Sequence, residues 1–417
     1  MDSNEKTISL EAFNLSEQIK NLQQLIAAYR PDYSLPAQFY TDKAVYQADL
    51  QAVFYKKWIY AGHVSQIAET GCYFLTEFCG ESIIVVRDDE GKIRAFANVC
   101  RHRGSKVCLE SSGRTRLFVC PYHAWAYQLD GKLRSKRSMP ADFDQSDYGL
   151  KPVGVDVLCG LIFINLDAAA PGFSEGLGAM VPALEIYRLE DTKVACQKTF
   201  TVDANWKLAI ENFMECYHCT PAHKEYSCSH ALNSPADYER LRPDMLVQAE
   251  SLGYQIESVD QSKPQHPDAI QHFYNRSAMY ESYVTGSEDG APLAPLLGDI
   301  GAFGGGAADM QFGPVTYAIA YPDHLVLYRF LPAGIEKTDM DIIWLVNKDA
   351  EQGVDYDLDK LTWLWTVTTE ADKTIILNNQ KGVNSIFYQP GPLSEMESYI
   401  TTFLQWYIGQ LRHALQV

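Results

Sequence analysis

Cys100-Arg101-His102, followed after seventeen residues by Cys120-Pro121-Tyr122-His123, is the stretch that decides the fold of this chain. The two motifs together provide two thiols and two imidazoles. Thiolates and imidazoles are strong ligands for zinc and iron. The stretch therefore predicts a metal cofactor held between two loops.

The spacing of these four ligands favours a Rieske [2Fe–2S] cluster, in which two His replace two Cys on one iron. Structural zinc sites usually pair two Cys in one motif and two His in the other. Here each motif carries one Cys and one His, so two similar loops can approach a flat binuclear cluster from opposite sides. We expect the cluster on Cys100, His102, Cys120 and His123, with structural zinc as the alternative.

The composition is ordinary for a globular protein large enough for two domains. The chain has 417 residues, 47% of them hydrophobic and 21% charged. A net charge of −18 argues against nucleic acid as a partner, because such partners need a basic surface. No run approaches the roughly 20 apolar residues that span a bilayer, and no secretory signal precedes the first elements. We therefore expect a cytoplasmic protein without membrane contact, in which the other eight cysteines are free thiols.

Residues 1–50 are expected to form an N-terminal arm that packs on the catalytic domain. Leu15, Ile19, Leu22 and Ile26 are spaced for one helix face, and Pro31 interrupts that pattern.

Residues 51–165 are expected to form a small all-β domain. The segments 82–87 and 93–96 read as paired strands. A hairpin is predicted from 126–129 to 132–134, with Asp130-Gly131 in a type I′ turn. Both cluster motifs then lie on loops carried by rigid strands.

Residues 166–417 are expected to form a larger catalytic domain, an antiparallel sheet flanked by helices, so that the fold class is α+β. The sequence predicts helices over 201–220 and 356–380 and a meander of strands over 315–321, 324–331 and 339–346. Residues 284–309, with Gly304-Gly305-Gly306, are expected to form a mobile loop, either a gate for substrate or a surface excursion.

A second set of candidate ligands follows Asn205-Trp206-Lys207. On a continuous helix Glu211, Glu215 and His218 share one face, and Pro221 ends the helix. The break allows His223 to return toward His218, so that both can bind one metal.

Asp372 is the expected third ligand, completing a two-His-one-carboxylate triad. It lies on an apolar stripe of the helix 356–380, where a carboxylate needs a partner or a metal. Glu370 lies off the stripe and is a weaker candidate. Two alternatives stay open: the two His are ordinary core or surface residues, or His218 belongs to a zinc knuckle with Cys216 and Cys219.

From about residue 35 to the C-terminus, the chain resembles the oxygenase component of the Rieske non-haem iron oxygenases. Glu215-x2-His218-x4-His223 is similar to the iron motif of that family, and Asp372 with the later Gln380-Lys381-Gly382 fits the third ligand. The resemblance implies a [2Fe–2S] cluster and a mononuclear non-haem Fe(II) in one chain.

Three further segments resemble the quaternary-ammonium branch of the family, which includes glycine betaine and proline betaine demethylases and choline monooxygenase. They are Trp344-Leu345-Val346-Asn347-Lys348-Asp349, Gly353-Val354-Asp355-Tyr356-Asp357-Leu358 and Pro390-Gly391-Pro392. Most ring hydroxylases have Asp where this chain has Glu215, and Glu is typical of the amine-oxidising members. The resemblance implies that Glu215 bridges the cluster of one subunit to the iron of its neighbour in a homotrimer.

The function expected from this resemblance is O2-dependent hydroxylation and N-demethylation of a small cationic amine, a betaine-like quaternary ammonium compound, with release of formaldehyde. Electrons would come from an NAD(P)H-dependent flavin/iron–sulfur reductase. Tyr217, Phe387 and Tyr388 are candidates for an aromatic cage around the cation. An arene dioxygenase and a non-enzymatic Rieske electron carrier are the alternatives.

Overall fold

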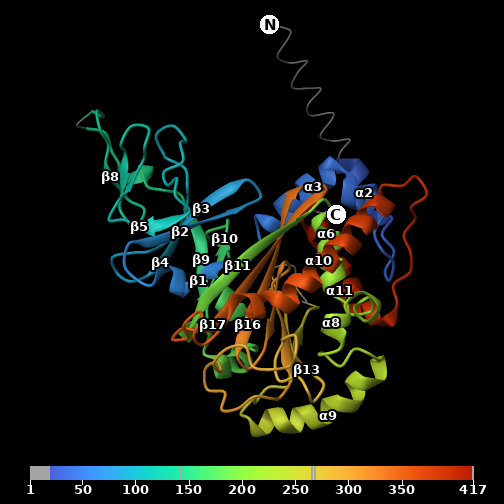
Figure 1. The fold of residues 1–417 in the computed structure, drawn as a ribbon. Coiled ribbons are helices and arrows are strands. Elements are labelled where there is room, and N and C mark those ends of the chain that lie inside the picture. Colours follow the sequence, from blue (N-terminus) through green and yellow to red (C-terminus); the bar gives the residue numbers. More distant parts are fainter. Residues whose placement is uncertain (1–18, 141, 264–265, 267–268, 416–417) are drawn as a thin grey trace.

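Two antiparallel sheets of seven strands each organise the protein, and helices pack on the second of them (Figure 1). The structure is a computed structural model that describes residues 19–140, 142–263, 266 and 269–415. No helix in these ranges is both long enough and apolar enough to cross a lipid bilayer.

The first sheet has the strand order β1-β10-β9-β4-β3-β2-β5, and a three-stranded sheet β6-β7-β8 lies at its far end (Figure 1). The bounds are β1 Ile59–His63, β2 Cys72–Phe78, β3 Glu81–Arg87, β4 Ile93–Ala97, β5 Ser112–Arg114, β6 Phe118–Val119, β7 Ala126–Tyr127, β8 Leu133–Ser135, β9 Pro152–Leu158 and β10 Leu161–Asn165. The predicted strands over 82–87 and 93–96 are confirmed as β3 and β4, which pair antiparallel.

The hairpin between β7 and β8 forms as predicted, but its turn is not type I′. Gln128 N–H donates to Lys132 O at 2.9 Å, and Gly131 N–H donates to Gln128 O at 3.0 Å. Gly131 has φ +86°, whereas Asp130 is not among the residues with positive φ. A type I′ turn needs positive φ at both positions, so this is a three-residue loop closed by a left-handed glycine.

The second sheet has the order β11-β17-β16-β15-β14-β13-β12 and carries the predicted meander. Its bounds are β11 Thr192–Val202, β12 Ser258–Gln261, β13 His272–Ser277, β14 Ala307–Phe312, β15 Thr316–Ala320, β16 His324–Gly334 and β17 Lys337–Asn347. Along β16, Val326 and Tyr328 belong to one apolar cluster, while Leu325 and Leu327 belong to another. Because side chains alternate between the faces of a strand, this sheet is buried on both sides.

Helices cover one face of this second sheet (Figure 1). The helices used below are α3 Lys43–Asp49, α6 Trp206–Phe213, α7 Cys219–Ala222, α8 Lys224–Ser227, α9 Pro235–Ser251, α10 Leu358–Val383 and α11 Ser398–Leu415. The predicted helix over 356–380 is confirmed as α10, whose buried residues include Ile376 and Gln380.

The predicted helix over 201–220 is wrong at both ends. Residues up to Val202 belong to β11, and α6 begins after Asn205, whose side chain accepts from Lys207 N–H at 3.1 Å. The helix stops at Phe213 because the carboxylate of Glu215 accepts the backbone N–H groups of Tyr217 and His218, a local turn that competes with helical hydrogen bonds.

The segment before residue 50 contacts the helices α6 and α11. A helix spans residues 19–27, with Leu22 and Ile26 buried and Ile19 exposed, whereas Leu15 lies outside the described residues. At the end of α3, the buried carboxylate of Asp49 accepts hydrogen bonds from Trp206, Lys207 and Tyr407. The division into an arm, a domain over 51–165 and a domain over 166–417 stays a prediction.

The glycine-rich end of the segment 284–309 is held against β13. Arg276 donates to Gly305 O at 2.9 Å and to Gly306 O at 3.2 Å. Residues 307–309 are part of β14 rather than of a loop. The remainder is irregular, as predicted.

Candidate active site

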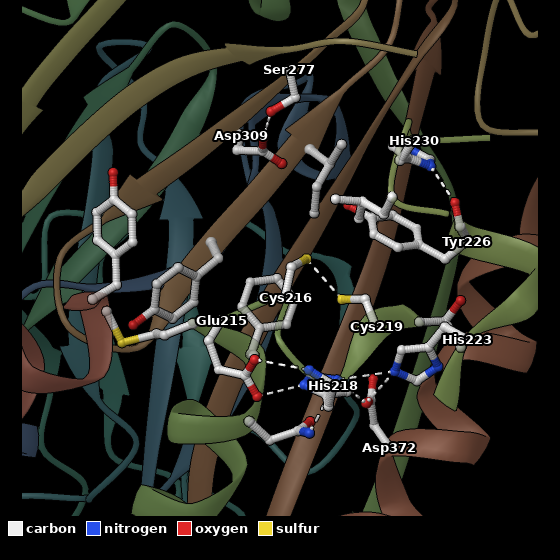
Figure 2. A pocket seen from close by; sticks show the side chains of 18 of the residues that line it. Glu215, Cys216, His218, Cys219, His223, Tyr226, His230, Ser277, Asp309 and Asp372 are labelled. Carbon is white, nitrogen blue, oxygen red and sulfur yellow. Dashed lines mark hydrogen bonds and ion pairs between the residues drawn. The ribbon is translucent and has the colours of Figure 1, made fainter. Parts of the chain in front are cut away.

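Three side chains from two separate parts of the chain meet beneath the second sheet: His218, His223 and Asp372 (Figure 2). His218 lies immediately before α7, His223 lies immediately after it, and Asp372 projects from α10. Their ligand atoms all lie within 4.8 Å of one another. The short helix α7, which contains Pro221, is what turns the two imidazoles toward each other.

The spacing of these atoms fits three neighbouring positions of an octahedral metal. The two Nε2 atoms of His218 and His223 are 3.1 Å apart, and Asp372 Oδ1 lies 3.3 Å and 2.8 Å from them. Ligand atoms about 2.1 Å from one metal and at right angles are about 3.0 Å apart, against about 3.4 Å for a tetrahedron. The residues therefore fit a facial triad, as non-haem iron requires.

Glu215 fixes the orientation of His218. Its Oε1 lies 2.6 Å from His218 Nδ1, so that Nδ1–H donates to the carboxylate and Nε2 faces the triad. Burial alone would lower the pKa of His218, but hydrogen bonds to Asp372 and Glu215 outweigh it and raise the pKa to about 10 in the metal-free protein. Asn212 adds a contact of 3.3 Å to His218 Nε2.

The two cluster motifs form two loops with the same backbone hydrogen bonds. Cys100 N–H donates to Ser105 O at 2.8 Å, and Cys120 N–H donates to Trp125 O at 2.8 Å. The residue four positions after each Cys donates back to that Cys carbonyl and has positive φ, at Gly104 and Ala124. The prediction of two similar loops is confirmed.

The thiols of these loops are less exposed to solvent than the imidazoles, as is typical of a Rieske cluster. Cys100 and Cys120 are buried, whereas His102 is exposed and its ring lies 4.6 Å from that of His123. His102 stacks on Trp125, with ring centres 4.8 Å apart. The donor set thus suits a cluster whose sulfur-bound iron is enclosed and whose imidazole-bound iron faces outward.

Comparisons with known proteins agree with this geometry. Residues 57–151 match the Rieske [2Fe–2S] domain family, and residues 189–413 match the catalytic domain of the ring-hydroxylating alpha subunit family. The chain is 36% identical over 384 residues to the glycine betaine monooxygenase oxygenase subunit of Chromohalobacter salexigens, which covers 90% of this chain and 85% of that protein.

The chain belongs to the Rieske non-haem iron oxygenases. It is also 38% identical over 222 residues to the carnitine monooxygenase oxygenase subunit of Escherichia coli, which covers 52% of this chain and 59% of that protein. The crystal structure of a quaternary ammonium Rieske monooxygenase with an inhibitor has the same fold at 24% identity, with a TM-score of 0.69 over 92% of this chain and 97% of that one.

Membership in the Rieske oxygenases decides several of the expectations. The α+β fold, the Rieske [2Fe–2S] cluster and the mononuclear non-haem iron are confirmed. The catalytic-domain match excludes the alternative of a non-enzymatic electron carrier, and the Rieske match excludes structural zinc at the first cluster. The eight cysteines outside the cluster motifs form no disulfide, as expected.

The zinc-knuckle alternative at the second site does not fit the oxygenase. The sulfur atoms of Cys216 and Cys219 contact each other at 2.7 Å, while His218 faces His223 and Asp372. Neither Cys belongs to the group of converging ligand atoms. Glu370, the weaker candidate ligand, is exposed.

The expected aromatic cage is not at the iron site of the oxygenase. Tyr217 and Phe387 are 57% and 86% exposed, and Tyr388 donates to Leu35 O at 2.9 Å. None of these three residues lines the cavity beside the triad. The positions of these three residues in the sequence do not show which way their rings point, because helix ends and loops can turn a ring outward as easily as inward.

A cavity of about 320 Å³ opens beside the triad and is walled by other residues (Figure 2). Aromatic walls come from Phe213, Tyr226, Tyr238, Phe273, Tyr317, Trp365 and Tyr399. Polar groups include Asn212, Asn275, Ser277 and Asp309. Tyr238 and the lining residues on β13 and β14 come from a region of the sequence that carries no motif.

Proposed function

We propose that this oxygenase hydroxylates an N-methyl group of a quaternary ammonium compound and thereby removes it as formaldehyde. In the overall reaction, the N-methyl ammonium ion, O2, two electrons and two protons give the N-hydroxymethyl ammonium ion and water. The hydroxymethyl compound then breaks its C–N bond to give the tertiary amine, formaldehyde and a proton.

The cavity carries this proposal, because its wall is aromatic and, outside the proposed metal ligands, has no positively charged side chain among the described residues. Among the described residues that line it, none is Lys or Arg. Burial lowers the pKa of His230 to about 3, so this lining imidazole is neutral near pH 7. Aromatic faces attract quaternary cations, and Glu215, Asp309 and Asp372 add carboxylates to the lining. The names of the relatives, glycine betaine and carnitine monooxygenases, support the same substrate class.

The proposed site residues divide the tasks of this reaction among them. His218, His223 and Asp372 would hold the iron, and Cys100, His102, Cys120 and His123 would hold the cluster. When bound, the cluster supplies single electrons and the iron activates O2 for insertion into a C–H bond. Glu215 holds His218 in the tautomer that leaves Nε2 free for metal.

Glu215 is also the proposed bridge toward the cluster of a neighbouring subunit. A homotrimer and an NAD(P)H-dependent flavin/iron–sulfur reductase complete the proposal. The outward-facing His102 supports delivery of electrons at the surface of the Rieske domain.

The test is formaldehyde release from a panel of glycine betaine, proline betaine, carnitine and choline, with a surrogate reductase and O2. We expect release from at least one of them, in proportion to the NADH that is consumed. The matched control is His218→Ala, which should abolish release. No release from any methylated amine would reject the demethylase.

An arene dioxygenase is the second candidate, because the aromatic wall also suits a flat apolar ring. It predicts a cis-diol from an arene and no formaldehyde from methylated amines. The carboxylates in the cavity argue against it, because an apolar ring offers them no partner.

A further inference from the structure

A carboxylate lies at the far end of the cavity from the triad. Figure 2 shows Asp309 with Ser277 at one end and His218, His223 and Asp372 at the other. Asp309 lies on β14 and pairs in register with Asn275 on β13 and Ile319 on β15, which place it on the same face of the sheet. All three side chains line the cavity.

Asp309 has acceptor capacity that the protein leaves unused. Ser277 donates its hydroxyl hydrogen to Asp309 Oδ2, and this is the single side-chain partner that the described residues provide. A carboxylate has about four acceptor positions. No described Lys or Arg lies within ion-pair distance of Asp309. Arg276, on the neighbouring strand, donates to backbone carbonyls and to tyrosine hydroxyls instead.

The groups around Asp309 shift its pKa in opposite directions. Burial raises the pKa of Asp309 above its usual range and outweighs the Ser277 hydrogen bond and the positive charge of Arg276, which act to lower it. A partly buried carboxylate without an ion pair costs folding free energy, and residues that are costly in this way concentrate at functional sites. A donor or cation arriving in the cavity would favour the charged form.

We propose that Asp309, oriented by Ser277, binds the end of the substrate remote from the reacting methyl group and selects hydroxyl- or ammonium-ended quaternary amines over carboxylate-ended ones. This inference rests on the proposed function, which places the methylated nitrogen beside the triad. The remaining arm of the substrate then extends along the cavity toward Asp309.

A hydroxyl group at that end donates its hydrogen to the free oxygen of Asp309. A carboxylate there meets a second carboxylate and finds no Lys or Arg among the described lining residues. Such like-charge contact is the usual repulsive element in substrate discrimination. Choline and its longer amino-alcohol or diamine analogues therefore fit this cavity better than glycine betaine or carnitine.

The first experiment measures equilibrium binding, which does not depend on turnover. Choline and glycine betaine share the trimethylammonium group and differ in the terminal group, so isothermal calorimetry on the holoenzyme compares them directly. We expect choline to bind more tightly. In Asp309→Asn, choline affinity should fall about 10- to 100-fold, the range for a hydrogen bond to a charged group, while betaine affinity stays or rises.

Two further variants separate this role from a structural one. Ser277→Ala keeps the carboxylate and removes the group that orients it, so we expect a smaller loss of choline affinity. Asp339→Asn changes a partly buried carboxylate on β17 that accepts a hydrogen bond from Thr201 and does not line the cavity, so it should leave both affinities unchanged. Circular dichroism checks that each variant is folded.

The outcomes distinguish this inference from the proposed function. Equal binding of choline and betaine by the wild type, or an equal loss of both in Asp309→Asn, overturns the role of Asp309. Tighter binding of betaine that Asp309→Asn weakens would show a protonated Asp309 donating to the substrate, and also overturns it. A choline preference that depends on Asp309, but without formaldehyde from any amine, supports the inference and rejects the demethylase.

Discussion

Replacing Glu215 with Gln tests the link between the iron ligands and electron supply. The carboxylate of Glu215 accepts from His218 Nδ1 at 2.6 Å and from the backbone N–H groups of Tyr217 and His218. The pair is largely buried, with side-chain exposures of 10% and 18%. A charge-assisted hydrogen bond of this kind contributes about 1.5–3 kcal/mol.

Gln keeps one acceptor oxygen, so it can still hold His218 in the same tautomer. The loss of charge should weaken iron binding by about 10-fold, at the low end for such supporting partners. We therefore expect Glu215→Gln to bind all three irons when iron is supplied in excess. Its product formation per bound iron should nevertheless fall, because the neutral amide cannot serve as the charged bridge toward the cluster.

The assay combines iron content per chain with single-turnover reoxidation of the reduced cluster, followed by its visible absorption in the presence of O2 and substrate. Glu225→Gln, an exposed carboxylate on the following helix, is the matched control and should behave as the wild type. Normal reoxidation and normal turnover in Glu215→Gln would remove Glu215 from the electron path.

Two other expectations can be checked on the purified protein. His218→Ala should lose the mononuclear iron and keep the visible absorption of the cluster, measured by metal analysis and spectroscopy; loss of both would show that the two sites are not separable. Burial lowers the pKa of His63 to about 4, and its Nδ1 accepts from Ser65 N–H while Nε2–H donates to Leu189 O. The unfolded chain, with an ordinary His pKa of 6.5, therefore binds more protons between pH 6.5 and 4, and stability is lost as the pH falls through that window. We expect the free energy of unfolding, measured by urea denaturation, to fall by about 2 kcal/mol because of His63 when the pH is lowered from about 7 to about 5. An unchanged pH dependence in His63→Gln would contradict this.

The sequence alone was enough to nominate the two sets of candidate ligands. Cys100, His102, Cys120 and His123 are close in the chain, and their mixed spacing determines two loops of equal geometry. His218 and His223 are likewise local, since a short helix of four residues between them brings both rings to one point. Local spacing can be read from a sequence because the backbone allows few conformations over a handful of residues.

Local reasoning failed where a side chain competes with the backbone. The helix predicted through Glu215 ends at Phe213, because the carboxylate takes the N–H groups that a helix would use. Glu211 consequently faces away from the iron site and accepts from Tyr40. Periodicity cannot reveal this competition, since the same spacing suits both a helix and a turn.

The substrate cavity was decided by the tertiary structure alone. Tyr217, Phe387 and Tyr388 have suitable rings but lie outside it, whereas Asp309 reaches it because strand register aligns β14 with β13 and β15. Cavity walls come from residues far apart in the chain, and only sheet pairing and helix packing bring them together. Metal ligands occur in short motifs that can be recognised in a sequence. The selectivity of the pocket, in contrast, arises from long-range contacts that no motif contains.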